Sequence, residues 1–348
     1  MQPPDPQLPA VPAVPAVPAL LAFCRDFRAR GAAQPIVWDG GVGTALIARG
    51  LELGREPPEA WLLRRPDEVL AVHSEFAGAG AEVLQTCSFG LVRLFVEPSS
   101  KLSALGPEAE FTELAALVQQ SVRLANQAAR HRASPQPAEP TEPTSPTAAP
   151  TVIGCLGPTG RTGIDEGRLA AAYGAAAHAF HAAGVAALHL ETCLDPGELQ
   201  LALRGIRQAA PELALMVSLT LSMGQSGPET PLGVPLGRML RELDHHPLPL
   251  AMVGINCSQP ARRLHAAVAA LYGWTAGRLP ILVQPQVGDP APDCRHPARP
   301  ESPERFARDL LRLRDEGASA LGGCCGARGP HIRALRQALA SSPEPSAG

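Results

Sequence analysis

Short apolar runs recur along the chain, and each is followed by a longer stretch with the residue spacing of a helix. Runs of this length and composition are typical of strands. The predicted strands lie at residues 36–39, 83–86, 151–157, 187–192, 213–221, 251–257, 280–286 and 320–325.

The stretches between these runs predict helices, and several begin with residues that stabilise a helix N-terminus. Asp165, Asp195 and Ser302 stand at such starts, and a proline follows the last two, as is common in a first helical turn. The predicted helices lie at residues 66–80, 107–132, 165–184, 195–210, 235–244, 259–272, 302–318 and 329–340.

Repeated strand-then-helix units predict an α/β protein with a parallel sheet, and eight such units are the number that closes a TIM (β/α)8 barrel. We therefore expect a single barrel. An open doubly wound sheet is the structural alternative, and only the number of units disfavours it.

Three segments fall outside this pattern. Residues 1–19 form a Pro/Ala/Val-rich tail that we expect to be disordered, and residues 343–348 form a second tail. Residues 133–150 are rich in Pro, Thr and Glu, so they are either a domain linker or an insertion in a surface loop. Because the alternation continues across them, we expect a loop insertion within one barrel domain over residues 20–342.

Composition limits the kinds of partner. Of the 348 residues, 45% are hydrophobic, which predicts a sizeable core; 30 basic and 33 acidic residues give a formal charge of −3. This balance, with 4% aromatic residues, gives no basic or stacking surface for nucleic acid, so small molecules are the expected partners. No apolar run is long enough to span a membrane and the start lacks the basic residues of a signal peptide, so we expect a cytoplasmic protein.

Three cysteines fall at the predicted carboxyl ends of strands, where active sites of TIM barrels gather. Cys257 ends the sixth strand, and Cys324 and Cys325 end the eighth. Three thiolates with an open fourth position suit a catalytic Zn²⁺, whereas structural zinc sites are closed by four ligands. The alternative is that all three are buried core cysteines. The glycines that flank Cys324 and Cys325 favour the metal site, because they suggest an unusual backbone that aims both sulfurs inward.

The remaining cysteines receive simpler interpretations. A disulfide framework is disfavoured because the chain is long and two cysteines are adjacent. We expect Cys155 and Cys193 to pack in the core, and we expect Cys24 and Cys294 to lie in tail or loop.

Other polar residues also end predicted strands. Asp39, Gly40 and Gly41 follow the first strand, where backbone amides can approach a carboxylate and Asp39 can meet an ammonium group. Glu191 ends the fourth strand, so it either binds a cationic amine or forms a salt bridge with an arginine. Asn256 precedes Cys257 at the end of the sixth strand, and His189 lies within the fourth, facing either side of the barrel.

These motifs resemble those of the homocysteine S-methyltransferases, including the homocysteine-binding module of cobalamin-dependent methionine synthase. The resemblance covers residues 36 to 340, and its most specific elements are GINC at 254–257 and GGCCG at 322–326. The other matching stretches are WDGGVGTALIARG (38–50), LQTCSFGLVRL (84–94), IGCLGPTG (153–160), HLETCLDPGEL (189–199) and LGGCCGARGPHI (321–332).

The resemblance implies a zinc-dependent methyltransferase that forms methionine from homocysteine. It implies that Cys257, Cys324 and Cys325 hold Zn²⁺ and that the amino acid end of homocysteine binds near Asp39, Gly40, Gly41 and Glu191. We add Asn256 as a candidate substrate contact. The expected donor is S-methylmethionine or S-adenosylmethionine, betaine, or methylcobalamin on a separate corrinoid protein. A barrel that only binds zinc or thiols, such as a sensor, is the alternative.

Several positions near the predicted mouth depart from the usual pattern of relatives. Cys87 and Ser88 stand within a motif that is usually Thr-Asn-Thr, and Gln284 and Gln286 stand within one that is usually Tyr-Pro-Asn-x-Gly. Ala327 follows the paired cysteines where relatives usually carry threonine. We expect these changes to affect donor choice or substrate contacts. The sequence does not predict an oligomeric state.

Overall fold

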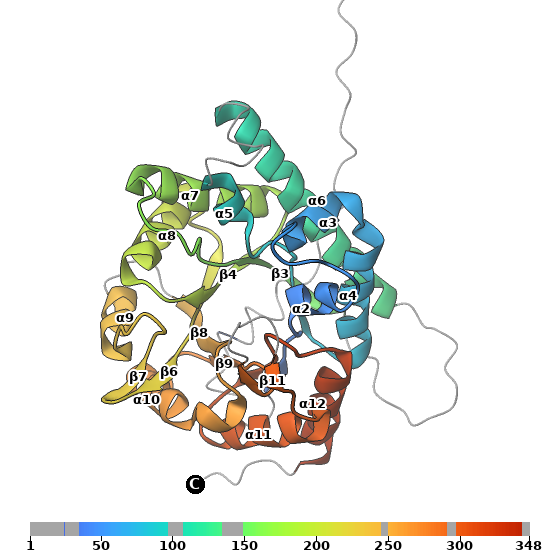
Figure 1. Ribbon diagram of the computed structural model, residues 1–348, viewed down its shortest axis with the longest axis vertical. Coiled ribbons are helices and arrows are strands. Elements are labelled where there is room, and N and C mark those ends of the chain that lie inside the picture. Colours follow the sequence, from blue (N-terminus) through green and yellow to red (C-terminus); the bar gives the residue numbers. More distant parts are fainter. Residues whose placement is uncertain are drawn as a thin grey trace, which may run out of the picture.

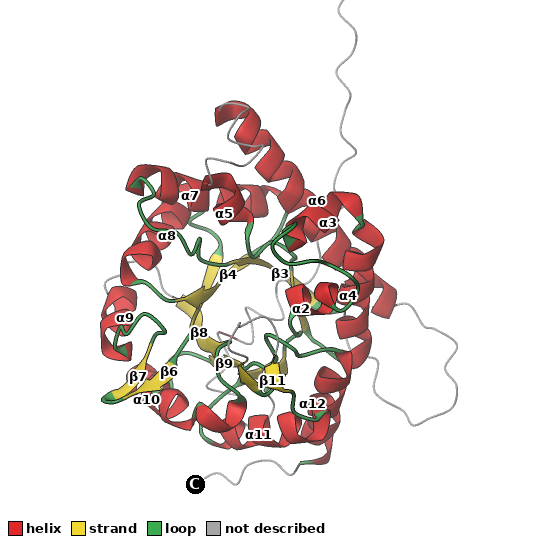
Figure 2. Cartoon of the chain, viewed as in Figure 1, coloured by secondary structure: helices red, strands yellow, loops and turns green. Residues whose placement is uncertain are grey.

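In a computed structural model of the protein, eight parallel strands form the centre of the molecule. The structure describes Cys24 and residues 35–96, 107–133, 149–244, 250–290 and 297–342. Figures 1 and 2 show the strands surrounded by helices. The strands are β1 (Ile36–Val37), β2 (Val83–Gln85), β3 (Thr151–Leu156), β4 (Ala187–Cys193), β5 (Ala214–Leu219), β8 (Leu250–Asn256), β9 (Ile281–Gln284) and β12 (Ala320–Leu321).

The strands follow one another in chain order around a barrel. The sheet order is β1-β12-β9-β8-β5-β4-β3-β2, with every neighbouring pair parallel. Its two edges are joined by a parallel bridge between Trp38 and Val83, and the Glu82 amide donates to the Val37 carbonyl at 2.7 Å. The predicted TIM barrel is therefore confirmed, and the open doubly wound sheet is excluded.

Helices between successive strands cover the outside of this barrel, as the sequence pattern predicts. Asp165, Asp195 and Ser302 accept a backbone N–H at the starts of α7, α8 and α11, as expected for N-cap residues. The helices are α4 (Pro66–Ala79), α6 (Pro107–Ala133), α7 (Glu166–Ala182), α8 (Pro196–Ala209), α9 (Leu236–Asp244), α10 (His265–Thr275), α11 (Pro303–Asp315) and α12 (Gly329–Ser341).

Several predicted boundaries are wrong. The strand expected at 320–325 ends at Leu321, so Cys324 and Cys325 lie in the loop after β12. The helix expected at 259–272 begins six residues later, because extended Pro260 is followed by a 3-10 turn, η2 (Ala261–Arg263), before α10 starts.

The sequence pattern also missed short elements in the loops. They are α2 (Val42–Ile47), η1 (Pro58–Ala60), α3 (Trp61–Arg64), α5 (Leu91–Val96), the hairpin β6 (Ser222–Gly224) with β7 (Gly227–Glu229), and the pair β10 (Asp289–Pro290) with β11 (Pro297–Arg299).

The interior of the barrel has an apolar layer and a polar layer. The polar layer contains Gln85, His189, Ser218 and Gln284, all at most 5% exposed. His189 therefore faces inward, since its ring is bonded to Gln85 and Ser218. The apolar layer takes one residue from or beside each strand: Trp38, Val83, Ile153, Ala187, Met216, Met252, Leu282 and Ala320.

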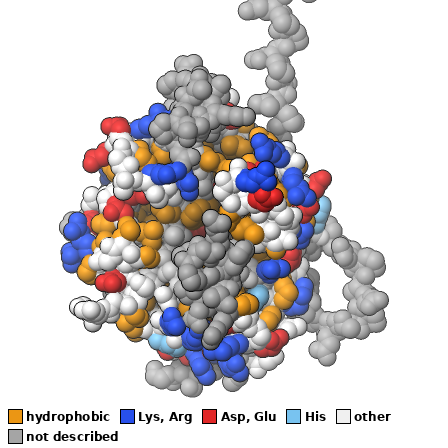
Figure 3. Space-filling view, viewed as in Figure 1, with side chains coloured by type: hydrophobic (Ala, Val, Ile, Leu, Met, Phe, Trp, Pro, Cys, Tyr) orange, Lys and Arg blue, Asp and Glu red, His pale blue; other side chains and the backbone are white. Residues whose placement is uncertain are grey.

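Outer helices divide their residues between core and solvent. On α11, Phe306 and Leu310 are fully buried, whereas Arg305 and Arg312 have side chains more than half exposed. Figure 3 shows acidic and basic side chains distributed around the molecule, with basic ones gathered along the lower edge. Within the described residues, no helix is both long and apolar enough to cross a membrane.

Some predictions concern residues beyond the described ranges. The tails at 1–19 and 343–348, Cys294, and all of the Pro-rich segment except residues 133, 149 and 150 lie outside them. The strands on either side of that segment, β2 and β3, pair with each other in the same barrel.

Candidate metal and substrate site

Three thiols meet at the carboxyl ends of β8 and β12. The sulfurs of Cys257, Cys324 and Cys325 all lie within 4.8 Å of one another, and those of Cys257 and Cys325 are 3.6 Å apart. Two thiolates on one tetrahedral zinc, each about 2.3 Å from the metal, would lie about 3.8 Å apart. The spacing of this cluster, which is half-buried, therefore fits a zinc ion.

The thiols also influence one another's protonation. Hydrogen bonds from the Cys324 and Cys325 thiols lower the pKa of Cys257 well below its usual range. The same contacts with Cys257 raise the pKa of Cys324 and Cys325, and burial adds to this effect. The contacts among the three sulfurs thus favour the thiolate form at Cys257 over its two neighbours.

Residues 284–287, at the end of β9, join the two loops that carry the cysteines. The Cys257 amide donates to the Gln284 carbonyl at 3.0 Å, and the Gln286 amide donates to the Gln259 carbonyl at 3.2 Å. On the other side, the Cys324 amide donates to the Pro285 carbonyl and the Val287 amide to the Cys325 carbonyl, both at 2.9 Å. These four backbone hydrogen bonds set the distance between the cysteine-bearing loops.

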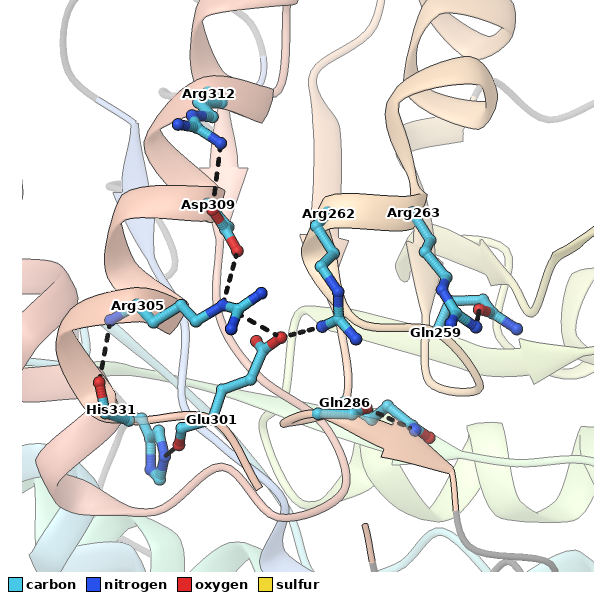
Figure 4. A network of polar contacts seen from close by, with 11 residues as sticks. Gln259, Arg262, Arg263, Gln286, Glu301, Arg305, Asp309, Arg312 and His331 are labelled. Atoms are coloured by element: carbon cyan, nitrogen blue, oxygen red, sulfur yellow. Dashed lines mark hydrogen bonds and ion pairs between the residues drawn. The ribbon is translucent and has the colours of Figure 1, made fainter. Parts of the chain in front are cut away.

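Glu301 provides a second connection between those loops. Its buried carboxylate pairs with Arg262, which follows the Cys257 loop, and lies 3.8 Å from Arg305 on α11. Its carbonyl accepts from His331 Nε2 at 3.4 Å, because His331 Nδ1 already accepts the Arg328 amide. Figure 4 shows Glu301 between Arg262, Arg305 and His331.

The glycine-rich loop after β1 packs directly against the paired cysteines. A side chain at Gly41 would collide with the Cys324 carbonyl. The Thr44 hydroxyl donates to the Gly41 carbonyl and accepts the Gly326 amide, both at 3.0 Å. Gly326 has φ 83°, a conformation that glycine adopts readily. Close backbone packing therefore requires glycine at Gly41, whereas the backbone conformation favours glycine at Gly326.

A cavity of about 590 Å³ opens beside the three thiols. The predicted residues Gly40, Gly41 and Glu191 line it. Asp39 lies immediately behind Gly40 and is fully buried. The remaining wall comes mainly from the loops after β1 and β2 and includes Val42, Gly43, Thr44, Leu53, Arg55, Glu56, Glu59, Gln85, Cys87, Ser88, Phe89, Arg93, Cys155, Thr192 and Gln284.

Within the described residues, the hydrogen-bond partners of the Glu191 carboxylate are neutral. The structure therefore does not show the salt bridge with an arginine that was the alternative. Glu191 Oε2 accepts from Gln85 Nε2 at 3.2 Å, and the Cys155 thiol also bonds to the carboxylate. Burial raises the pKa of Glu191 to about 7, against the lowering effect of these hydrogen bonds. A cationic group in the cavity would stabilise the ionised carboxylate.

Gln85 is a site residue that the strand pattern did not single out. Its Nε2 donates to Glu191 and to His189 Nδ1 at 3.2 Å each, and its Oε1 accepts from Gln284 Nε2 at 2.7 Å. His189 Nε2 can then donate to Ser218 Oγ at 2.8 Å. Burial lowers the pKa of His189 to about 3, so the ring is neutral. A polar residue within an apolar strand, as at Gln85, was the available signal.

Asp39 has an unused hydrogen-bonding capacity. Its Oδ2 accepts the Gln85 amide at 2.7 Å, whereas its buried Oδ1 has no hydrogen-bond partner. Burial raises the pKa of Asp39 well above its usual range, and the nearby Glu191 adds to this. A donor group from a ligand would satisfy Oδ1 and favour the ionised form.

The positions that depart from relatives have distinct surroundings. Cys87, Ser88 and Gln284 line the cavity, and the Ser88 hydroxyl also donates to the Cys155 carbonyl at 2.7 Å. Gln286 donates to the Gly288 carbonyl at 2.9 Å, and Ala327 is fully buried. Three of the five changes therefore face the space that a ligand would occupy.

Fold and site together define a class: a parallel α/β barrel with a cluster of three thiols suited to a metal at the carboxyl ends of its strands. A sequence model of the family described as homocysteine S-methyltransferase matches residues 36–339. The chain belongs to this family, which confirms the resemblance found in its motifs.

Individual relatives agree with this assignment. The chain is 28% identical over 318 residues to the methionine synthase of Mycobacterium tuberculosis, covering 89% of this chain but 25% of that protein. It is 39% identical over 98 residues to homocysteine S-methyltransferase 3 of Arabidopsis thaliana, which is 27% of each chain. The chain thus spans about a quarter of the length of these matched relatives.

A solved structure shows the same fold. The metallated form of the homocysteine methyltransferase MmuM from Escherichia coli superimposes with a TM-score of 0.69 at 23% identity. The match covers 90% of this chain and 98% of that one. At this level of identity the comparison supports the fold.

Proposed function

We propose that this protein transfers a methyl group to the thiol of homocysteine, forming methionine, with a zinc ion held by Cys257, Cys324 and Cys325. Three sulfurs on two distant loops, spaced for one tetrahedral ion at the edge of a ligand-sized cavity, are the observation that carries the proposal. Membership of the homocysteine S-methyltransferase family supports the same substrate.

When bound, zinc would supply thiolate chemistry, because a coordinated thiol loses its proton at neutral pH. The homocysteine sulfur then uses a lone pair to form the new bond to the methyl carbon. The bond between that carbon and the donor's leaving group breaks, and the leaving group keeps its electron pair. The thiol proton leaves to solvent, so atoms and charges balance.

We assign the amino acid end of homocysteine to the part of the cavity wall formed by Glu191 and the loop after β1. Glu191 lines the cavity and is available for the ammonium group of homocysteine, with Asp39 buried behind Gly40. Gly40 and Gly41 also line the cavity, and because they carry no side chain their backbone allows a carboxylate to approach closely. Glu191 thereby sets the position of the sulfur relative to the three thiols.

The donor is assigned as a small cationic molecule, such as S-methylmethionine or S-adenosylmethionine. The cavity is lined by Glu56 and Glu59 as well as by Arg55 and Arg93, and the buried Oε2 of Glu59 has no hydrogen-bond partner. A positive methyl donor would be attracted to these carboxylates. The cavity is also large enough for a second small ligand beside homocysteine.

The test is a methylation assay on the zinc-loaded full chain. Homocysteine is supplied with S-methylmethionine, S-adenosylmethionine, betaine, or a methylcobalamin protein, and methionine is measured by mass spectrometry. We expect one of the sulfonium donors to yield methionine, and we expect Cys257→Ala, Cys324→Ala and Cys325→Ala each to lose zinc and turnover together. Production only with betaine or the corrinoid protein would reassign the donor. Zinc and homocysteine binding without methionine from any donor would support the binding-only alternative.

A further inference from the structure

Asn256 occupies a position between the substrate wall and the metal site. Its side chain is fully buried and is absent from the residues that line the cavity. Its Oδ1 accepts the Thr192 amide at 2.8 Å, and its Nδ2 donates to the Thr192 hydroxyl at 2.8 Å. The same Nδ2 lies 4.0 Å from the Cys324 sulfur, within reach of a hydrogen bond to sulfur.

The orientation of this amide follows from its partners. The Thr192 backbone N–H can only donate, so the oxygen of Asn256 must face it. The two hydrogens on Nδ2 are then left for the Thr192 hydroxyl and the Cys324 sulfur. Every polar group of the side chain is used within the protein, which leaves none for a substrate.

The backbone on both sides of this amide is held in a conformation that L-residues seldom adopt. Thr192 has φ 62°, and Cys257, which follows Asn256, has φ 61°. Left-handed conformations at residues other than glycine persist only where surrounding contacts hold them, and they gather at functional sites. The two hydrogen bonds between Asn256 and Thr192 hold one of these segments against the other.

We infer that Asn256 is a positioning residue that fixes the metal site relative to Glu191 and donates an N–H to the Cys324 sulfur. We call the two hydrogen bonds between Asn256 and Thr192 the clamp. Because Thr192 directly follows Glu191, the clamp sets the distance between the Glu191 carboxylate and the thiol cluster. An N–H donor stabilises a thiolate and withdraws charge from it. Such outer contacts orient metal ligands and tune the metal they hold. The inference rests on the zinc site of the proposed function and replaces the substrate contact predicted from sequence.

The test compares Asn256→Asp with wild type and with Asn126→Asp, the same change on the outer helix α6. Aspartate keeps an acceptor for the Thr192 amide but has no N–H for Cys324. We expect zinc affinity, measured by competition with a chromogenic chelator, to fall about 10- to 100-fold. In the cobalt-substituted protein we expect the sulfur-to-metal charge-transfer band to shift. Asn126→Asp should leave both properties unchanged.

A second variant separates the clamp from general stability. Thr192→Val removes the hydroxyl that accepts from Nδ2, while the Thr192 position keeps its backbone N–H. It should weaken zinc binding in the same direction but by less than Asn256→Asp, and it should leave the cobalt band near its wild-type position. The inference is overturned if Asn256→Asp binds zinc normally, keeps the wild-type cobalt band, and only raises KM for homocysteine.

These measurements need no turnover. If the wild-type protein binds metal but forms no methionine with any donor, the proposed function fails. The clamp is still decided by the metal affinities and the cobalt spectra.

Discussion

At the scale of a single side chain, we propose that recognition of homocysteine depends on Glu191, which lines the cavity beside the three thiols. In Glu191→Gln, the carboxylate that we assign to the ammonium of homocysteine becomes a neutral amide. Loss of a charge-assisted hydrogen bond of about 1.5–3 kcal/mol corresponds to a roughly 10- to 100-fold rise in the Kd of homocysteine. Titration calorimetry on the zinc-loaded protein measures this, with Glu68→Gln on the outside of α4 as the matched control. Equal affinity in wild type and Glu191→Gln would contradict the assignment.

The same carboxyl group predicts a pH dependence of stability. Its folded pKa of about 7 lies above the ordinary value of 4.5, so the folded protein binds the proton more tightly than the unfolded chain. Stability therefore falls as pH rises from about 4.5 to 7, by at most roughly 3 kcal/mol from this group. Denaturant unfolding of the metal-free protein measures this effect. Between pH 5 and pH 8, the free energy of unfolding of Glu191→Gln should rise relative to that of wild type. A difference between the two proteins that does not change with pH would refute this.

The candidate ligands could be located from sequence, whereas their surroundings could not. Cys257, Cys324 and Cys325 follow apolar runs, and parallel strands bring their carboxyl ends to one edge. Whether Gln85 and Cys155 belong to the site depends on which side chains face inward at one level of a closed barrel. That property is set by the register between strands, which local sequence does not contain. Cys155, expected only to pack, lines the cavity and bonds to Glu191.

The loop after β1 illustrates how whole elements meet at the site. Gly41→Ala would place a methyl group against the Cys324 carbonyl, so one of the two loops must move. We expect a loss of zinc affinity of at least about tenfold, measured by chelator competition, because displaced ligands bind metal less well. Gly43→Ala, two residues away, would have Pro58 as its nearest neighbour at 3.9 Å. It should bind zinc normally and be more stable by up to about 1 kcal/mol, since alanine favours helix α2. Equal behaviour of the two variants would show that the close approach is unimportant.

Regular elements were easier to predict than the connections between them. All eight barrel strands and all eight outer helices were expected, because burial imposes a pattern over many residues. The start of α10 was misplaced, and α2, α3 and α5 were missed. The three missed helices are only four to six residues long, which is too short for a periodic pattern to identify.

For the molecule as a whole, the Pro-rich segment tests the single-domain interpretation. We expect that replacing residues 134–148 with a Gly/Ser segment of equal length leaves the thermal unfolding midpoint and methionine formation nearly unchanged. The reason is that β2 and β3 already pair across the segment, and a flexible connection of equal length has a similar closure entropy. Calorimetry and the methylation assay measure the two properties. A loss of either would mean that the segment takes part in folding or binding.

The four backbone hydrogen bonds that join β9 to both cysteine loops have an evolutionary consequence. Main-chain amides and carbonyls are present whichever side chain a residue carries, so this frame tolerates substitution. Gln284 and Gln286 could thus replace other residues of the relatives while the spacing of the sulfurs was preserved. Side chains along this edge of the barrel can therefore change, and with them the ligands that the cavity accepts, while the spacing of the three thiols is kept.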